Sequence, residues 1–132
     1  KVAIGWHDDC MLRYSNSSIF NTKETNPSLY TWRHTGNATD VDEFNRVLKN
    51  LLYSLASQAS LGDSRHKFAA ANASRPGLQT IYGLAQCTLS KKDSSACLFE
   101  TIADISECCD NKNGATSVTP SCNIRYECIP LL

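Results

Sequence analysis

The sequence repeats a short cysteine-centred pattern near its two ends, and this repeat constrains the fold more than any other feature. The first copy consists of Ala3, six further residues and Cys10–Tyr14. The second copy consists of Ala115, six further residues and Cys122–Tyr126, so that the spacing is identical. In both segments a cysteine, an aliphatic residue and a tyrosine alternate with other residues, which is the period of a strand. The N-terminal end is therefore predicted to be a strand from another copy of the C-terminal part.

The repeat divides the chain into three parts. We expect residues 1–20 to be the closing strand of a preceding domain copy and residues 21–38 to be a linker or an irregular hairpin. Residues 39–132 are expected to form one domain. With 42% apolar residues in the sequence, a domain of this size can bury a hydrophobic core.

Two stretches of the C-terminal part have the period of a helix. The first begins with Thr39 or Asp40 as its cap and ends near Gly62, and the second follows a turn at residues 90–95. The apolar face of the first helix consists of Val41, Phe44, Leu48, Leu51, Leu52, Leu55 and Ala59. That of the second consists of Cys97, Leu98, Ile102, Ile105 and Cys109. Phe68–Ala70 is a short apolar stretch, and strands are expected at residues 78–89, 115–118 and 121–129. This order predicts an α+β fold, with an antiparallel sheet covered by helices on one face.

Charge, hydropathy and sequons narrow the compartment and the partners. Thirteen basic residues balance thirteen acidic ones without a basic stripe, so neither nucleic acid nor an anionic membrane is expected as a partner. No apolar run approaches the roughly 18 residues of a membrane span. N-glycosylation sequons begin at Asn16, Asn37 and Asn72, and together with seven cysteines they predict a secreted, extracellular chain.

Neither catalysis nor a bound metal or other cofactor is expected. The three histidines lie in predicted strand edges or loops, and no nucleophile, phosphate-binding or zinc-protease motif is present. His7 to Cys10 have the residue types of metal ligands. Adjacent strand residues point to opposite faces, however, and cannot converge on one ion.

Short motifs along the C-terminal part resemble one known family. They are Tyr82–Cys87, Cys97-Leu98, Cys108-Cys109, Gly114-Ala115 and Ser121–Glu127. In this combination they resemble the plant cysteine-rich domain of the ginkbilobin, or stress-antifungal, type. That domain occurs in tandem in the ectodomains of cysteine-rich receptor-like kinases and in secreted repeat proteins. The resemblance implies about five antiparallel strands with two α-helices on one face, bridged by disulfides, and makes residues 1–20 the last strand of the first domain of such a tandem.

The resemblance also implies how some cysteines pair. It implies a bridge from Cys97 to Cys122, and it makes Cys10 the only cysteine available to bridge Cys109. The repeat gives Cys10 a competing role, because the closing cysteine of a preceding copy would pair with a helix that this chain does not contain. An odd number of cysteines fits a free thiol, a bridge to another chain, or a partner in a part of the protein that this chain does not contain.

The remaining cysteines have no assigned partners. Relatives carry a cysteine where this chain has Ser94, so Cys87 lacks the partner that the family would give it. Cys128 is an addition to the family pattern, and Cys108 is left over. A vicinal bridge from Cys108 to Cys109 would be strained, and we do not expect it.

The resemblance offers a sugar-binding site as the functional site. Mannose-binding members use an Asn beside the N-terminal cysteine, an Arg after the Gly-Ala of the hairpin and a Glu after the final Arg-Tyr. The candidate positions here are Met11, Thr116 and Glu127, of which only Glu127 keeps the family's residue. We expect Glu127 to be an exposed acid at a strand end, and Arg125 to point to the opposite face of the sheet. Loss of the guanidinium then weakens the case for mannose binding.

Two functions follow. The first is a secreted, non-enzymatic recognition module of the apoplast, in plant stress and antifungal defence, that binds a mannose-like glycan or an extracellular protein. The alternative is a self-assembling structural protein, in which the N-terminal strand completes a neighbouring subunit's sheet. Cys10 would then link the chains of a homo-oligomer.

Overall fold

The computed structural model describes residues 2–7, 10–18, 29–32, 37–62, 67–88 and 90–128. Their elements, in chain order, are β1 (Val2–His7), β2 (Cys10–Ser15), β3 (Leu29–Trp32), α1 (Val41–Leu61), β4 (Phe68–Ala73), β5 (Ile81–Cys87), α2 (Lys91–Cys108), β6 (Gly114–Val118) and β7 (Cys122–Glu127).

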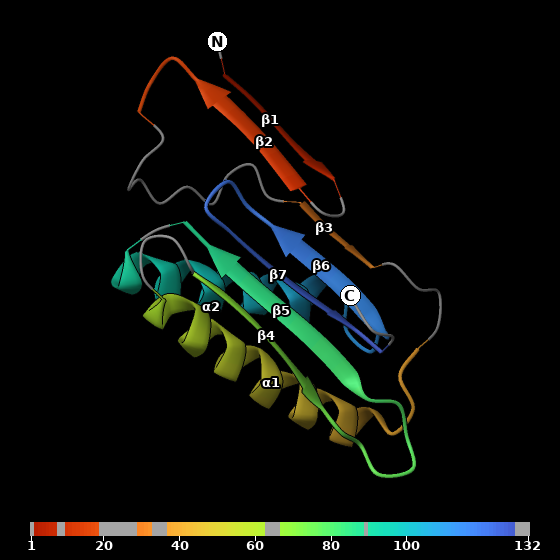
Figure 1. The fold of residues 1–132 in the computed structure, drawn as a ribbon. Helices are drawn as coiled ribbons and strands as arrows, with labels where there is room; N and C mark the ends of the chain where they lie inside the picture. The colour runs from red at the N-terminus through yellow and green to blue at the C-terminus, as the bar shows by residue number, and fades with distance from the viewer. Residues whose placement is uncertain are drawn as a thin grey trace.

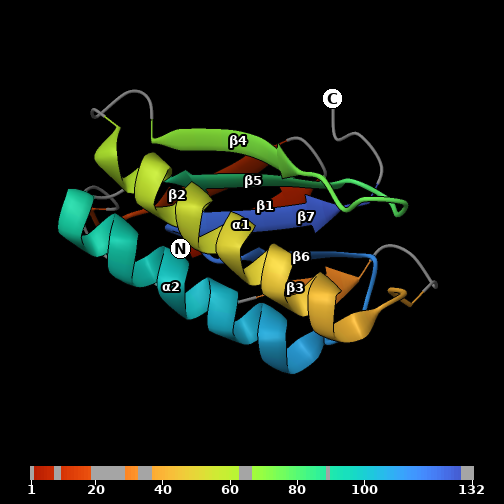
Figure 2. The same ribbon diagram turned by 90° about the horizontal axis from the view of Figure 1, so that it is seen from below.

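Two layers make up the main body of the fold. Strands β3-β6-β7-β5-β4, in that order, form a five-stranded antiparallel sheet. Helices α1 and α2 lie side by side across one face of it (Figures 1 and 2). This arrangement confirms the α+β class and the two helices on one face. A separate two-stranded sheet, β1-β2, is hydrogen-bonded to none of the five strands.

Helix α1 follows directly from the sequence pattern. Asp42 and Glu43 lie in its first turn, where acidic side chains complement the helix dipole, and the helix ends before Gly62. Its apolar face packs on the sheet, so closely that a Cβ added at Gly83 of β5 would lie 2.6 Å from Leu55 Cδ1. The largest fully buried side chains of the core come from both layers: Phe44, Leu52, Leu55, Ile81, Leu98, Ile124 and Tyr126.

Helix α2 begins earlier than the sequence predicted. Residues 90–95 were expected to be a turn, but the helix already starts at Lys91. The side chain of Ser90 caps it by accepting a hydrogen bond from the backbone N–H of Asp93 at 3.4 Å. A polar helix N-terminus and a turn use the same residue types, and this explains the misassignment.

Two strands lie where none was assigned. Within residues 21–38, the expected linker, Leu29–Trp32 form β3 and pair with β6. Ala38 is buried, and its N–H donates to Asn111 O at 2.7 Å. The stretch that starts at Phe68 extends into β4, which pairs with β5. Residues 19–28 and 33–36 lie outside the described part of the chain.

The repeated sequence pattern is a repeated hairpin rather than a single repeated strand. Ala3 pairs with Tyr14 in the β1-β2 hairpin, and Ala115 pairs with Tyr126 in the β6-β7 hairpin. The register agrees at every paired position that the two hairpins share, because five of the six pairs in β1-β2, all but His7 with Cys10, have a counterpart at the same offset in β6-β7. The first hairpin is thus a structural copy of the second, without the sheet neighbours and helices that the second has.

Candidate functional site

Strand β7 divides its side chains between the two faces of the central sheet. Cys122, Ile124 and Tyr126 are buried in the core beneath the helices. Successive strand residues point to opposite faces, so Arg125 and Glu127 lie together on the face away from the helices. This corrects the expectation that Arg125 points away from Glu127: residues two apart in a strand share a face.

Arg125 and Glu127 form an ion pair on this face, which we call the outer face because both helices cover the other one (Figure 2). Arg125 Nη2 donates to Glu127 Oε1 at 3.1 Å, and the two side chains are only 15% and 4% exposed. Glu127 is therefore a buried, paired carboxylate, which corrects the expectation of an exposed acid. Its position in an inner strand of the sheet explains the difference, because β6 and β5 flank it on both sides.

The neighbouring strands add polar groups beside this pair. Thr116 of β6 lies directly opposite Arg125, and Tyr82 of β5 lies directly opposite Glu127. Thr116 Oγ1 and Arg125 Nε are both buried without a hydrogen-bond partner within the described residues. A guanidinium, a carboxylate and a hydroxyl thus occupy adjacent positions, and this combination can donate to and accept from a pair of hydroxyl groups.

The structure does not bring Met11 to this cluster. Met11 lies in β2, opposite Trp6, and is 39% exposed. By the hairpin repeat its counterpart is Asn123, so its position does not match a residue of the Arg125 and Glu127 pair. Sequence reasoning therefore placed Glu127 and Thr116 in one neighbourhood, included Met11 and missed Arg125. The period of two in a strand was the signal that would have found Arg125.

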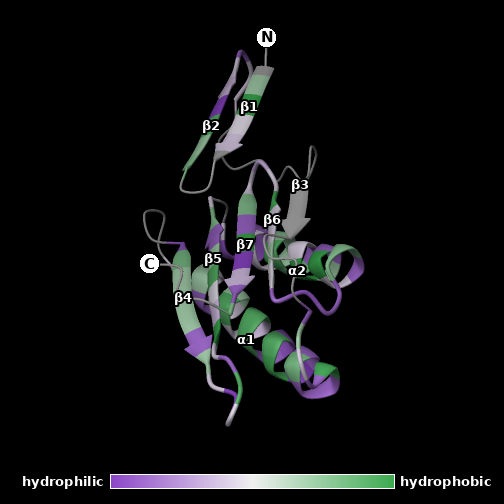
Figure 3. Cartoon of the chain, turned by 90° about the vertical axis from the view of Figure 1, so that its right-hand side faces the viewer, coloured by the Kyte–Doolittle hydropathy of each residue, from purple (hydrophilic) through white to green (hydrophobic). Residues whose placement is uncertain are grey.

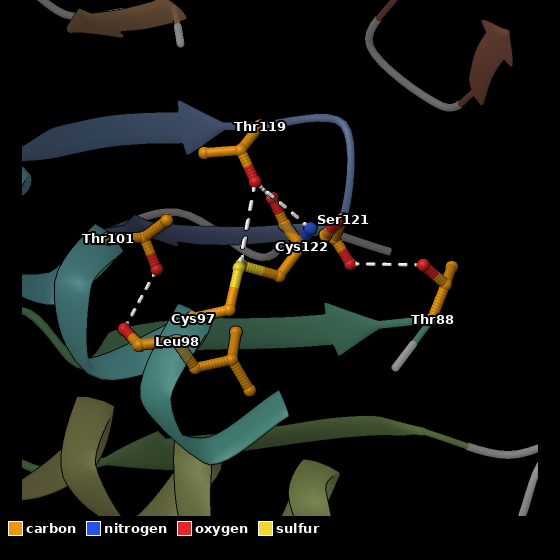
Figure 4. Close-up of a disulfide and its surroundings, with 7 residues drawn as sticks. All are labelled: Thr88, Cys97, Leu98, Thr101, Thr119, Ser121 and Cys122. Atoms are coloured by element: carbon orange, nitrogen blue, oxygen red, sulfur yellow. Dashed lines mark hydrogen bonds between the residues drawn. A yellow bond between two sulfur atoms is a disulfide. The ribbon is translucent and has the colours of Figure 1, made fainter. Parts of the chain in front are cut away.

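A disulfide joins α2 to β7 at one end of the core. Cys97 and Cys122 are bridged, the pairing that the family resemblance implies, and both are buried. Thr119 Oγ1 donates to Cys122 O at 3.0 Å and accepts from Cys122 N–H at 3.1 Å (Figure 4). A third cysteine, Cys87, is a buried free thiol that lies directly opposite Cys122 in the sheet. Ser94 of α2, at the position where the family resemblance implies a cysteine, is fully buried.

The other cysteines depart from the expected pairing. Cys109 is bridged to its neighbour Cys108, and Cys10 is a free, exposed thiol in β2. The bridge from Cys10 to Cys109, one of the two roles left open for Cys10, is therefore not formed, and the expectation of no vicinal bridge is wrong. Helix α2 ends at Cys108, and Cys109 has non-helical angles (φ −134°, ψ 28°), so the adjacent side chains no longer diverge around a helix. Cys10 belongs to the separate hairpin.

Cys128 and Tyr126 lie where β7 leaves the core. Tyr126 donates its hydroxyl to Lys112 O at 2.9 Å, and burial raises its pKa, with further contributions from Cys128 and Asp110. Burial also raises the pKa of the free Cys128 thiol, and Glu127 adds to this while Arg75 opposes it. A thiol with a raised pKa stays protonated and is poorly suited to nucleophilic catalysis.

Neither a metal centre nor a membrane span is found in the described part of the chain. Its His, Cys, Asp and Glu residues form no group of three that could hold an ion. Asp8, Asp9, His34 and His66 lie outside the described residues. No described helix combines the length and the apolar character needed to cross a bilayer.

Comparison with known proteins gives consistent matches. The salt stress response/antifungal family model matches residues 31–128. Cysteine-rich receptor-like protein kinase 26 of Arabidopsis thaliana is 40% identical over 96% of this chain and 19% of its own length. The antimicrobial ginkbilobin-2-like protein of Castanea crenata is 36% identical over 100% of this chain and 54% of its own.

A solved structure matches as well. The tandem DUF26 ectodomain of the Arabidopsis thaliana cysteine-rich receptor-like protein PDLP8 superposes with a TM-score of 0.71 at 25% identity. The match covers 89% of this chain and 51% of the PDLP8 chain. The chain thus spans about half, or less, of the proteins that it resembles.

Proposed function

The chain belongs to the salt stress response/antifungal family of extracellular cysteine-rich domains, and from this we propose that it is a recognition module that binds a mannose-like glycan on the outer face of its sheet. Its relatives are secreted proteins and receptor-like proteins with ectodomains, and this family places the chain outside the cell. We propose in addition that the module acts in plant stress and antifungal defence.

One observation carries the proposal, and it is the buried pair of Arg125 and Glu127 beside Thr116. A sugar presents neighbouring hydroxyls that each donate and accept, and a guanidinium next to a carboxylate complements them. The position of the family's arginine is Thr116 here, but Arg125 lies directly across from it on β7. Arg125 therefore supplies, from the neighbouring strand, the planar guanidinium that Thr116 cannot provide.

The test compares charge removal within the pair. In Glu127→Gln the carboxylate becomes an amide, and we expect the affinity for methyl α-mannoside to fall about ten-fold or more, equivalent to about 1.4 kcal/mol. Arg125→Lys, which keeps the charge but loses the planar fork, is expected to weaken binding as well. Isothermal titration calorimetry measures the affinity of both variants. Glu107→Gln is the matched control, because Glu107 is an exposed carboxylate on α2.

Folding must be separated from binding in this experiment. Breaking one half of a buried ion pair destabilises the fold by about 3–5 kcal/mol, whereas replacing both halves by apolar residues is often tolerated. The double variant Arg125→Leu with Glu127→Leu is therefore expected to fold, as judged by circular dichroism, and to bind no mannoside. Undetectable binding by the unaltered protein, or unchanged binding by the folded double variant, would overturn the proposal.

The hairpin supports a second proposal, which concerns assembly. Leu12 and Tyr14 are 70% and 56% exposed, whereas their counterparts Ile124 and Tyr126 are 0% and 1% exposed. Figures 1 and 3 show the hairpin, with its hydrophobic stretches, on the side of the sheet away from both helices. We propose that residues 1–20 belong to the sheet of another domain copy, which covers this surface.

That other copy precedes this one in the same polypeptide, and a neighbouring subunit is the alternative. In either case the exposed thiol of Cys10 is the counterpart of bridged Cys122, so its partner is a cysteine of the covering copy. The matched substitutions Leu12→Asp and Ile124→Asp test the proposal. In the present chain only Ile124→Asp should lower the stability, because Ile124 is buried and Leu12 is exposed.

A further inference from the structure

Strand β4 is an open edge of the five-stranded sheet. It pairs with β5 on one side, and Figure 2 shows it at the border of the sheet with no other labelled element beyond it. Its residues, Phe68–Ala73, read FAAANA and contain neither a charged residue nor a proline. Charged residues and prolines are two of the features with which natural edge strands prevent pairing with another chain, and β4 lacks both.

The free edge is also accessible and largely apolar. Phe68 is 50% exposed, and Ala70, Ala71 and Asn72 are exposed too. Small side chains leave the unpaired N–H and C=O groups of a strand open to a second strand. An edge of this kind is expected to pair with the same edge of another copy, unless something keeps the two apart.

Asn72 is placed to do this. It begins the sequon Asn72-Ala73-Ser74, and both Asn72 and Ser74 are exposed. Asn72 lies opposite Tyr82, which in turn lies opposite Glu127, so its side chain projects from the face away from the helices. By contrast, the sequon asparagine Asn37 accepts a hydrogen bond from Lys112 Nζ through Oδ1, at 3.4 Å.

We propose that Asn72 carries an N-linked glycan, and that this glycan keeps β4 from pairing with β4 of a second copy. The extracellular location of the family exposes the chain to N-glycosylation. An activated oligosaccharide with a pyrophosphate leaving group is the co-substrate: Asn72 Nδ2 forms a bond to the anomeric carbon, the bond from that carbon to the pyrophosphate oxygen breaks, and one amide proton is lost. A hydrated glycan on the outermost strand then occupies the space that an approaching strand needs. This inference is independent of the proposed sugar-binding site.

The test removes the glycan without altering the strand. Ser74→Ala abolishes the sequon by changing an exposed residue, and it leaves Asn72 in place. Both proteins are secreted from a glycosylating eukaryotic host. Peptide mass spectrometry is expected to find a glycan on Asn72 in the unaltered protein and none in Ser74→Ala. Sedimentation velocity is expected to show association of Ser74→Ala, with an apparent mass about two-fold that of the unaltered protein.

Two further variants locate the effect at the edge. Ser18→Ala removes the sequon at Asn16, next to the hairpin, and is expected to leave the mass in solution unchanged apart from the lost glycan. Adding Ala70→Lys to Ser74→Ala places a charge on β4 and is expected to restore the unassociated state. All variants contain the exposed hairpin, so any association through the hairpin contributes equally to each of them. An unmodified Asn72, a Ser74→Ala protein that sediments like the unaltered one, or continued association after Ala70→Lys would overturn the proposal.

Discussion

At the scale of single residues, the cysteines show how far a chemical pattern can be interpreted without a structure. The bridge between Cys97 and Cys122, which joins α2 to β7, is the one that the family resemblance implies. The vicinal bridge of Cys108 and Cys109 depends on where α2 ends, and the spacing of residues does not contain this information. Cys87 lies opposite Cys122 only because β5 pairs with β7 in one particular register.

The position of Cys87 predicts an alternative bridge. Directly opposite residues of an antiparallel pair have Cβ atoms about 4.5–5.5 Å apart, close to what a disulfide needs. In Cys97→Ser we expect Cys122 to form a bridge with Cys87, while the unfolding free energy falls by about 2–4 kcal/mol through loss of the link to α2. Non-reducing alkylation with peptide mapping should find Cys87 and Cys122 protected.

The double variant Cys97→Ser with Cys87→Ser is the control, and in it Cys122 should be alkylated. If both Cys87 and Cys122 react with the alkylating reagent in oxidised Cys97→Ser, the two thiols do not approach each other as the register indicates.

At the scale of elements, both helices were recognised from their periodicity. The charged side chains on them lead to testable predictions of stability. Asp104 of α2 has a raised pKa, first because of burial and then because of Glu107 and Glu100 on the same helix. A raised carboxyl pKa means that the folded state disfavours the charged form. The resulting cost is present above the folded pKa and disappears as the pH falls below it.

We therefore expect Asp104→Asn to stabilise the protein at pH ~7, by about 0.5 kcal/mol from the two like-charge pairs on the helix. The gain should vanish near pH ~3, where Asp104 is protonated in the folded state as well. Thermal unfolding followed by circular dichroism at both pH values measures this difference. Asp42→Asn, in the first turn of α1, should do the opposite at neutral pH, because its charge complements the helix dipole. Equal effects of Asp104→Asn at both pH values would contradict the assignment of the cost to the charged form of Asp104, which burial, Glu107 and Glu100 disfavour.

At the scale of the whole molecule, the two hairpins put the same sequence pattern into two environments. Ile124 is fully buried, whereas its counterpart Leu12 is 70% exposed. A charge at Ile124 should cost more than 4 kcal/mol and prevent folding, whereas a charge at Leu12 should change the stability by at most about 0.5 kcal/mol. Urea unfolding of Ile124→Asp and Leu12→Asp measures the two effects.

The same pair also tests the assembly proposal. In a chain extended by a preceding domain copy, Leu12→Asp should become as damaging as Ile124→Asp, because Leu12 is then covered. A large loss from Leu12→Asp in the present chain, or none in the extended one, would show that the hairpin is not part of a second sheet.

The sequence by itself determined the local elements, because helix and strand periods are encoded in residues that follow one another. It predicted α1, the α+β class and a strand repeated at the two ends, which the structure shows to be part of a repeated hairpin. It also contained the signal that Arg125 and Glu127 share a face. The family resemblance had placed Thr116 near Glu127, but only the tertiary structure decided that Thr116 lies opposite Arg125 and that Tyr82 lies opposite Glu127. Thr116 and Tyr82 reach this ion pair through the pairing of β7 with β6 and β5, and such pairing is a non-local property of the folded sheet. The burial of Glu127, the solvent exposure of Leu12 and the open edge of β4 arise in the same way, since each depends on which strand becomes a neighbour.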